Sequence, residues 1–375
     1  MGPLNAEQGL IRPPEAKSWI PTVLRIVFFF FLLYLFFTSI ELMSTAFKMA
    51  GRGFAEQLIN MVSDPVAGLI LGFVATGLIQ SSSTTTTIVV GLVASGTLSI
   101  ELAVPLIMGA NIGTTTTNTL VSMGHVTRPA EFERAFAAST VHDFFNVLAA
   151  LTILPIEMAF HPVQKMAVVL QGAFAGAGGM NLASPLKAVV KPLTDIIAGI
   201  IPHTIPLAIL GLAALFLALQ QMMKVMRGAF LSRLESLFNR VLFRNDAASF
   251  TLGMVATASV QSSSATTSLI VPLAGTGVLS LRQIFPYTLG ANIGTTITAI
   301  LASFSTGSPA AVTVAFAHLS FNILGIAVYY PLKALPMWLA TKAGKLAARS
   351  RRSTAVVVGI YVALIFLPLL YVFLS

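Results

Sequence analysis

Long runs of apolar residues dominate the sequence. Helices that cross a hydrocarbon core need roughly 20 such residues, and five runs meet this length, at 21–47, 133–154, 204–223, 310–330 and 355–373. Two further apolar regions, 66–123 and 247–304, are interrupted by clusters of Ser, Thr, Asn and Gly. The pattern predicts an all-α polytopic membrane protein.

The two interrupted regions are copies of each other. Residues 72–120 align without a gap with 253–301, at an offset of 181, and about half of the aligned positions are identical. The copies share three motifs, namely Gln-Ser-Ser-Ser at 80–83 and 261–264, Gly-Ala-Asn-Ile-Gly-Thr-Thr at 109–115 and 290–296, and His-x-x-Phe-Asn-x-Leu at 142–148 and 318–324. The chain therefore contains an internal duplication.

Each copy is predicted to hold a spanning helix, a re-entrant hairpin, a broken spanning helix and a last spanning helix. A hairpin folded at Gln-Ser-Ser-Ser enters and leaves on one side, so each copy crosses three times and the two repeats are inverted. The predicted units are an N-tail at 1–20, a first repeat at 21–154 (hairpin 66–98, broken helix 101–123), a linker at 155–203, a second repeat at 204–332 (hairpin 247–279, broken helix 282–304), a basic loop at 333–353 and a C-terminal transmembrane helix at 354–375.

Composition and charge favour the same class of protein. Hydrophobic residues make up 56% of the chain and charged residues 9%, against about 25% charged in soluble domains. The net charge of +9 is read as cationic cytoplasmic loops, and no nucleic-acid partner is expected. With a cytoplasmic N-terminus, 17 of the 22 Lys and Arg residues fall on the cytoplasmic side. This orientation makes the basic loop cytoplasmic, the linker extracellular and the C-terminus extracytoplasmic.

The polar clusters of the two copies carry the candidate chemistry. An unsatisfied polar group costs several kcal/mol in hydrocarbon, so such clusters need partners or a ligand. We expect Gly113 and Gly294 to supply the backbone angles of a helix break. Half-helix N–H groups favour an anion, whereas carbonyl, hydroxyl and amide oxygens suit Na⁺. Two hairpin tips and two breaks therefore predict a site for a small oxyanion and alkali cations. Ser and Thr that merely join helices are the alternative, disfavoured by four clusters in two matched copies.

Asp143 is the one acid within the body of a predicted span. A midplane carboxylate costs about 2.5–3.5 kcal/mol and by default marks an ion path. Asn146 lies one turn further on, whereas the second copy has Leu319 and Asn322 at the two positions. The pattern favours a sodium site; a proton site and a carboxylate that caps a neighbouring half-helix are the alternatives.

No other metal and no enzymatic chemistry are expected. The recurring His142 and His318 lack further ligands for a transition metal and are predicted to be buried and neutral. The chain has no cysteine, no nucleophile elbow and no phosphate-binding loop ending in Gly-Lys-Ser/Thr.

The paired motifs, together with Thr-Val-His-Asp-Phe-Phe-Asn at 140–146, resemble those of the type II sodium-dependent phosphate cotransporters. The resemblance covers roughly residues 23–373, and the short tail and loops are similar to those of a bacterial member, in the inner (plasma) membrane. It implies uptake of inorganic phosphate with Na⁺ by an elevator-like movement of the hairpin domain, with no cofactor. The phosphate ligands that it implies are Gln80, Ser81, Ser82, Ser83, Thr84, Gln261, Ser262, Ser263, Ser264, Asn111, Thr114, Asn292 and Thr295. The candidate sodium ligands are Asp143, Asn146, Ser83, Thr115, Thr119, Ser264, Thr296 and Asn322.

The resemblance also implies finer properties. An Asp at position 143 implies an additional Na⁺ and electrogenic transport. The second tip has Ala265 where the first has Thr84, so ligation at that position is not symmetric. An elevator needs a static scaffold, and by analogy a homodimer is one expectation. Two other functions stay open: a channel lined by the same tips, and a transporter of divalent carboxylates.

Overall fold

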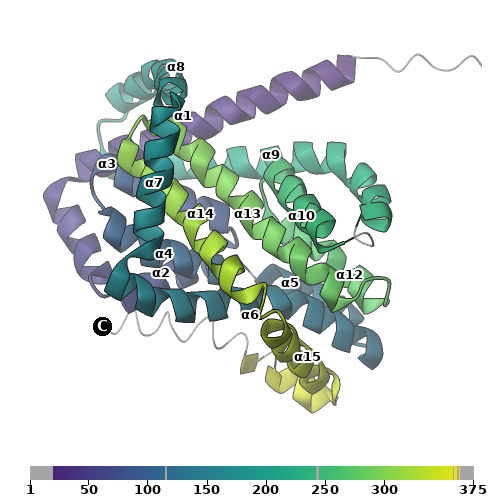
Figure 1. Cartoon of the computed structure of the whole chain (residues 1–375). Helices are drawn as coiled ribbons and strands as arrows, with labels where there is room; N and C mark the ends of the chain where they lie inside the picture. The colour runs from purple at the N-terminus through teal and green to yellow at the C-terminus, as the bar shows by residue number, and fades with distance from the viewer. Residues whose placement is uncertain (1–19, 115, 242–244, 358, 361–362, 364–375) are drawn as a thin grey trace, which may run out of the picture.

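The computed structural model (Figure 1) describes residues 20–114, 116–241, 245–357, 359–360 and 363. These residues form helices and connecting turns without a β-strand, which confirms the all-α prediction. The helices are α1 (Ile20–Val62), α2 (Pro65–Ile79), α3 (Ser82–Ser95), α4 (Ile100–Gly113), α5 (Thr116–Ser122), the short 3₁₀ helix η1 (Met123–His125), α6 (Pro129–Phe160), α7 (Pro162–Gly176), α8 (Gly179–Ile200), α9 (Thr204–Val241), α10 (Asp246–Val260), α11 (Ser263–Ser268), α12 (Ile270–Gly275), α13 (Leu281–Thr306), α14 (Pro309–Tyr329) and α15 (Ala334–Ala348).

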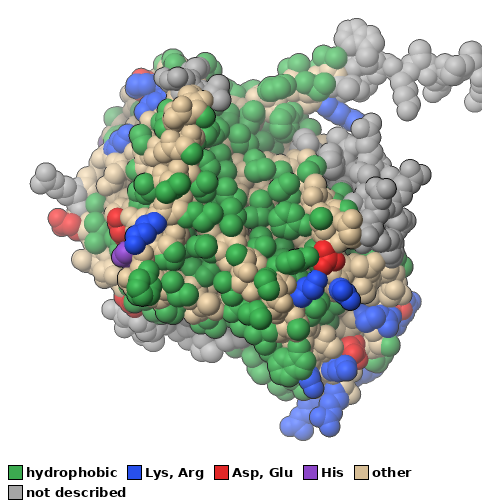
Figure 2. All heavy atoms as spheres, viewed as in Figure 1, with side chains coloured by type: hydrophobic (Ala, Val, Ile, Leu, Met, Phe, Trp, Pro, Cys, Tyr) green, Lys and Arg blue, Asp and Glu red, His purple; other side chains and the backbone are tan. Residues whose placement is uncertain are grey.

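Five of the described helices are long and apolar enough to cross a membrane. Their spans are Val23–Gly51, Pro129–Phe160, Thr204–Val225, Leu281–Thr306 and Pro309–Tyr329. A bent pair, Gly53–Val62 with Pro65–Ile79 at 101°, would make a sixth. Hydrophobic side chains cover most of the face seen in Figure 2, and charged side chains lie toward its margins. Such a surface suits a lipid environment, so the chain is a multi-pass membrane protein.

Helices α2 and α3, and likewise α10 and α11, are joined by a tight turn at the glutamine of a Gln-Ser-Ser-Ser motif, and each pair is called a hairpin below. Gln80 (φ 58°) and Gln261 (φ 59°) are left-handed and end α2 and α10. The next residue, Ser81 or Ser262, caps the following helix, because its hydroxyl accepts the N–H of Thr84 or Ala265. In each hairpin a threonine pair, Thr76–Thr85 at 2.9 Å or Thr257–Thr266 at 2.7 Å, bonds across the two arms. The two tips thus share one local structure.

Glycines let the first arm of each hairpin lie directly against the motif helix of its own copy. Arm α2 packs on α4, and α10 packs on α13. A Cβ added at Gly109 or Gly290 would lie 1.9 Å from the carbonyl oxygen of Leu69 or Phe250. Gly72 and Gly253 make the reciprocal approach. The close crossing therefore depends on the absence of a side chain at matched positions of both copies.

The predicted role of Gly113 and Gly294 in breaking the helices is wrong. Neither has a positive φ; a Cβ there would instead lie 2.6 or 2.5 Å from the carbonyl oxygen of Phe73 or Met254. These glycines also serve close packing. Only the first motif helix is interrupted, between α4 and α5, whereas α13 runs unbroken from Leu281 to Thr306. The predicted broken helix at 282–304 is therefore a continuous one.

The second copy is interrupted at a different place, in the second arm of its hairpin. That arm divides into α11 and α12 at Leu269, whereas α3 of the first copy is continuous. Pro272 stands where the first copy has Gly91. A proline lacks the N–H that would bond the carbonyl four residues earlier, and its ring crowds that carbonyl.

Two connecting segments are more ordered than predicted. The linker at 155–203 contains the end of α6, all of α7 and all of α8. The stretch at 333–353 is not a loop, since α15 occupies most of it and packs along α6. Ala340 and Ala347 are buried there while Lys342 and Lys345 are exposed, which explains a helix within a basic sequence. The predicted N-tail at 1–20, apart from its last residue, and most of the predicted helix at 354–375 lie outside the described residues.

The glycine crossing generates a stability prediction. Gly109→Ala forces a methyl group into the backbone of α2 and should destabilise the protein by at least 1–3 kcal/mol, roughly the cost of overpacking a core. Gly172→Ala is the matched control, because Gly172 is helical with nothing within 4 Å of the added Cβ. The control should be neutral or slightly stabilising. Thermal unfolding of the two purified variants measures the difference, and equal melting temperatures would contradict the packing account.

Candidate functional site

The two hairpin tips meet each other inside the protein. The Ser83 hydroxyl donates to the backbone carbonyl of Gln261 at 3.4 Å, so the second residue of α3 contacts the turn of the other hairpin. Ser264 donates to the carbonyl of Thr114 at 3.1 Å, where the first motif helix is interrupted. The N–H groups of the first two residues of α3 and of α11 lie outside the hydrogen bonding of their own helices, whereas the third is bonded by the capping serine. The structure therefore gathers two helix N-termini, hydroxyls and a helix break, all suited to charged ligands.

Behind the tips, the recurring His and Asn residues form a network that crosses between the copies. His142 of α6 bonds Asn292 of α13 (Nε2–Oδ1 2.5 Å), and His318 of α14 bonds Asn111 of α4 (Nε2–Oδ1 3.2 Å). The two pairs are equivalent, since His142 and His318 occupy matched positions of the two copies, as do Asn111 and Asn292. Asn146 joins the two halves, because it donates to the Asn111 carbonyl at 3.0 Å and accepts from Asn292 at 2.8 Å.

The network explains how these polar side chains are buried. All five are at most 4% exposed. Where the Asn oxygen accepts, the histidine Nε2 carries the proton. The crossed bonds also fix the motif helices of the two copies relative to each other, since buried polar groups hold strongly to their partners.

Two of the candidate sodium ligands, Asn146 and Asn322, bond members of this network. Asp143 is 8% exposed and stands between His142 and Asn146 on α6. Thr119 and Asn322 are at most 3% exposed, and their oxygens Oγ1 and Oδ1 have no hydrogen-bond partner among the described residues. A buried oxygen without a partner costs about 1–3 kcal/mol, which a bound cation would offset. Thr296 donates to Ile293 of its own helix, and Thr115 lies outside the described residues.

The predicted phosphate ligands fall into three groups. Those buried at the tips are Ser82, Ser83, Thr84, Gln261, Ser263 and Ser264, while Gln80 is exposed and Ser81 and Ser262 are half-buried. Asn111 and Asn292 belong to the crossed network. Thr114 and Thr295 donate their hydroxyls to the carbonyls of Ala110 and Ala291 in the preceding turn. The structure thus brings the tip residues together, with Gln261 buried and Gln80 exposed.

Several polar contacts of the tips were not predicted. The Gln261 side chain accepts from Thr298 at 2.6 Å. Asn118 of α5 and Thr267 of α11 exchange hydrogen bonds at 2.9 and 3.2 Å. The threonine pairs within the hairpins were missed as well. Most of these threonines are identical in the two copies, so the internal alignment held the signal that could have found them.

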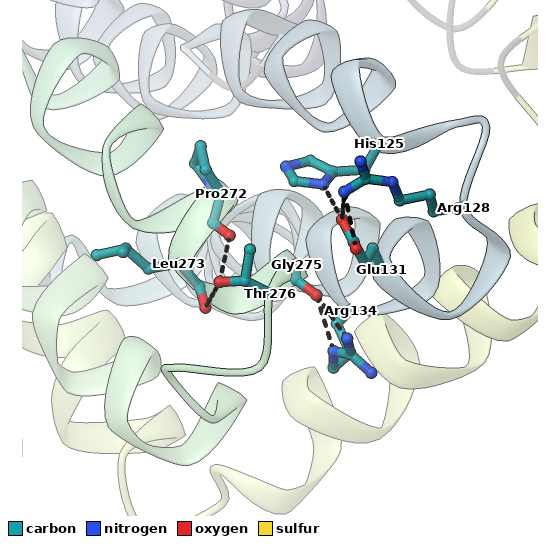
Figure 3. A network of polar contacts seen from close by, with 8 residues as sticks. All are labelled: His125, Arg128, Glu131, Arg134, Pro272, Leu273, Gly275 and Thr276. Atoms are coloured by element: carbon teal, nitrogen blue, oxygen red, sulfur yellow. Dashed lines mark hydrogen bonds and ion pairs between the residues drawn. The ribbon is translucent and has the colours of Figure 1, made fainter.

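Charged groups secure the far end of the second hairpin. Arg134 of α6 donates through Nε (3.0 Å) and Nη2 (2.7 Å) to the carbonyl of Gly275, the last residue of α12. Beside it, Glu131 bonds His125 at 2.9 Å and Arg128 at 3.1 Å (Figure 3). The His125 ring also lies close to Gly275, at 3.1 Å from the position of an added Cβ. The end of this second arm is therefore attached to the spanning helix α6.

Comparison with known proteins identifies the family. A model of the Na⁺/Pi-cotransporter family matches residues 35–183 and 214–367. The chain is 32% identical to sodium-dependent phosphate transport protein 2A of Ovis aries, over 92% of this chain and 67% of the relative. It is 30% identical to protein 2B of Homo sapiens, over 87% and 62%. It thus spans about two thirds of the length of these relatives. No solved structure gives a significant match. The chain therefore belongs to the Na⁺/Pi-cotransporter family, a family of membrane transporters and not of enzymes.

Proposed function

We propose that this protein is a secondary active symporter that imports inorganic phosphate together with Na⁺ by alternating access. The observation that carries the proposal is the meeting of the two Gln-Ser-Ser-Ser tips through Ser83 and Gln261. Family membership supplies the substrate and the coupling ion. The tips supply what a phosphate needs, namely first-turn N–H groups and hydroxyls in a site shielded from bulk water.

The proposed coupling is electrogenic and depends on Asp143. Divalent phosphate with three Na⁺ carries one net positive charge, and a potential of about 100 mV, interior negative, contributes about 2.3 kcal/mol to its entry. A carboxylate beside the crossed network is suited to the additional Na⁺. The first copy has this charge and the second, with Leu319, does not.

The proposed mechanism is an elevator-like movement of the two hairpins with the motif helices packed on them. The close crossings of α2 with α4 and of α10 with α13 support a unit that moves as one body. We propose that the N-terminus is cytoplasmic and the C-terminus extracytoplasmic, following the distribution of Lys and Arg. A bacterial inner membrane and a homodimeric assembly are part of the proposal by analogy.

Uptake into proteoliposomes tests the function. Radiolabelled phosphate should accumulate with an inward Na⁺ gradient and not with an equal K⁺ gradient, and the uptake should saturate. Gln261→Ala should lower uptake at least tenfold, because it removes a buried amide at the tip, an effect of about 1.4 kcal/mol or more. Gln57→Ala, at an exposed glutamine, is the control.

The alternatives give different results in the same vesicles. Equal phosphate flux in Na⁺ and K⁺ would favour a channel or proton coupling. Dicarboxylate uptake that phosphate does not inhibit would assign another substrate.

Asp143→Gly tests the electrogenic coupling. The variant should keep part of its phosphate uptake but lose its transport current, since one Na⁺ fewer makes the cycle electroneutral. Current and radiolabelled uptake are measured together in voltage-clamped membranes. An unchanged ratio of charge to phosphate would exclude this role of Asp143.

Thr119→Val tests whether the buried Thr119 hydroxyl binds a cation. If the hydroxyl is a ligand, removing it should raise the Na⁺ concentration for half-maximal uptake severalfold. A tenfold rise corresponds to a loss of about 1.4 kcal/mol of binding free energy. Thr313→Val is the matched control, because the buried Thr313 hydroxyl donates to its own helix at Pro309. A Thr119→Val protein that is more stable and has the same Na⁺ dependence would show that the hydroxyl is only a buried polar group.

A further inference from the structure

An amphipathic cavity of about 680 Å³ lies between the start of α6 and the end of α15. Its apolar wall includes Val126, Pro129 and Phe132. Arg349 and Ser350, from the turn after α15, and Arg351, the first residue of the helical stretch 351–357, line the other side. A volume of this size is typical of a ligand pocket, and it holds none of the residues of the candidate transport site.

The charge at this cavity is strongly positive and unopposed. Arg349 and Arg351 are exposed, and neither has an acidic partner in the described part of the chain. Glu131, which lies between the lining residues Pro129 and Phe132 in the sequence, is already bonded to His125 and Arg128 (Figure 3). Lys and Arg side chains gather at this lower end of the molecule in Figure 2. The cavity therefore suits an anion with two or more acceptor oxygens.

The position of the cavity identifies the source of such an anion. Pro129 lines the cavity and is also the first residue of a membrane-spanning helix, Pro129–Phe160. The end of a span lies at the level of the lipid headgroups. Val126 is 41% exposed and so leaves apolar surface beside the guanidinium groups. A phospholipid satisfies both chemistries, since its phosphate meets the arginines and its acyl chains meet the apolar wall.

We propose that this cavity is a binding site for one anionic phospholipid, held by Arg349 and Arg351 at its phosphate and by the Val126–Phe132 wall at its acyl chains. Hydrogen bonds hold the backbone that carries the arginines, because the Ser350 hydroxyl accepts the N–H of Ser353 at 3.1 Å and Thr354 donates to the carbonyl of Ala347 at 2.7 Å. The site is separate from the hairpin tips and does not depend on the transported substrate.

The test uses the full-length protein in detergent, titrated with phosphatidylglycerol or phosphatidylcholine and followed by native mass spectrometry. Phosphatidylglycerol should give a one-lipid adduct and phosphatidylcholine should not. Arg349→Gln with Arg351→Gln should weaken the adduct about 30-fold, because each cationic side chain near an anionic headgroup contributes about 1 kcal/mol. Lys342→Gln with Lys345→Gln removes the same charge from exposed positions of α15 outside the cavity and should retain the adduct.

A further variant and a competition experiment also test the lipid site. Val126→Glu places a carboxylate at the cavity without touching the turn and should also abolish the adduct, which covers the case in which the arginine variant fails to fold. Glycerol phosphate and inorganic phosphate, which lack acyl chains, should not displace the lipid. Equal loss in the arginine and lysine variants, equal binding of the two lipids, or displacement by inorganic phosphate would each overturn the proposal.

Discussion

The structure depends on one constraint, that polar side chains buried among membrane-spanning helices need partners. The crossed His142–Asn292 and His318–Asn111 bonds, joined through Asn146, meet this requirement and hold the two copies together. Without the other copy, the Nε2 atoms of His142 and His318 would lose the Asn oxygens that they bond, and a buried polar group without a partner costs several kcal/mol. The duplication therefore also supplies hydrogen-bond partners, because an Asn of each copy bonds a His of the other.

The two copies differ in local structure where their residues differ at matched positions. Asn118 of α5 bonds Thr267 of α11, whereas the second copy has Ala299 in place of Asn118 and has no such pair. The interruption between α4 and α5 and the interruption near Pro272 lie in elements that contact each other. The two glutamines of the tips also differ in exposure, since Gln261 is buried and Gln80 is exposed.

The sequence alone was sufficient for the fold class, because long apolar runs in a chain with few charges are compatible with few architectures. It was insufficient where backbone geometry decides. Gly113 and Gly294 were predicted to break helices but permit close helix contact, a choice that depends on neighbouring helices. The helix α15 was missed because its exposed Lys residues dominate the pattern, although its Ala- and Leu-rich sequence has high helix propensity. The crossed network joins residues about 150 and 207 positions apart, which no local pattern predicts.

The central claim is that Na⁺ and phosphate bind to one site built by both copies. Linkage then requires that each ligand raise the affinity for the other by the same factor. The direct measurement is equilibrium binding of radiolabelled phosphate to the purified protein, at saturating Na⁺ and at the same concentration of K⁺. The account predicts saturable binding that is at least tenfold tighter in Na⁺, a coupling free energy of about 1.4 kcal/mol or more. Equal phosphate affinity in the two salts would contradict it.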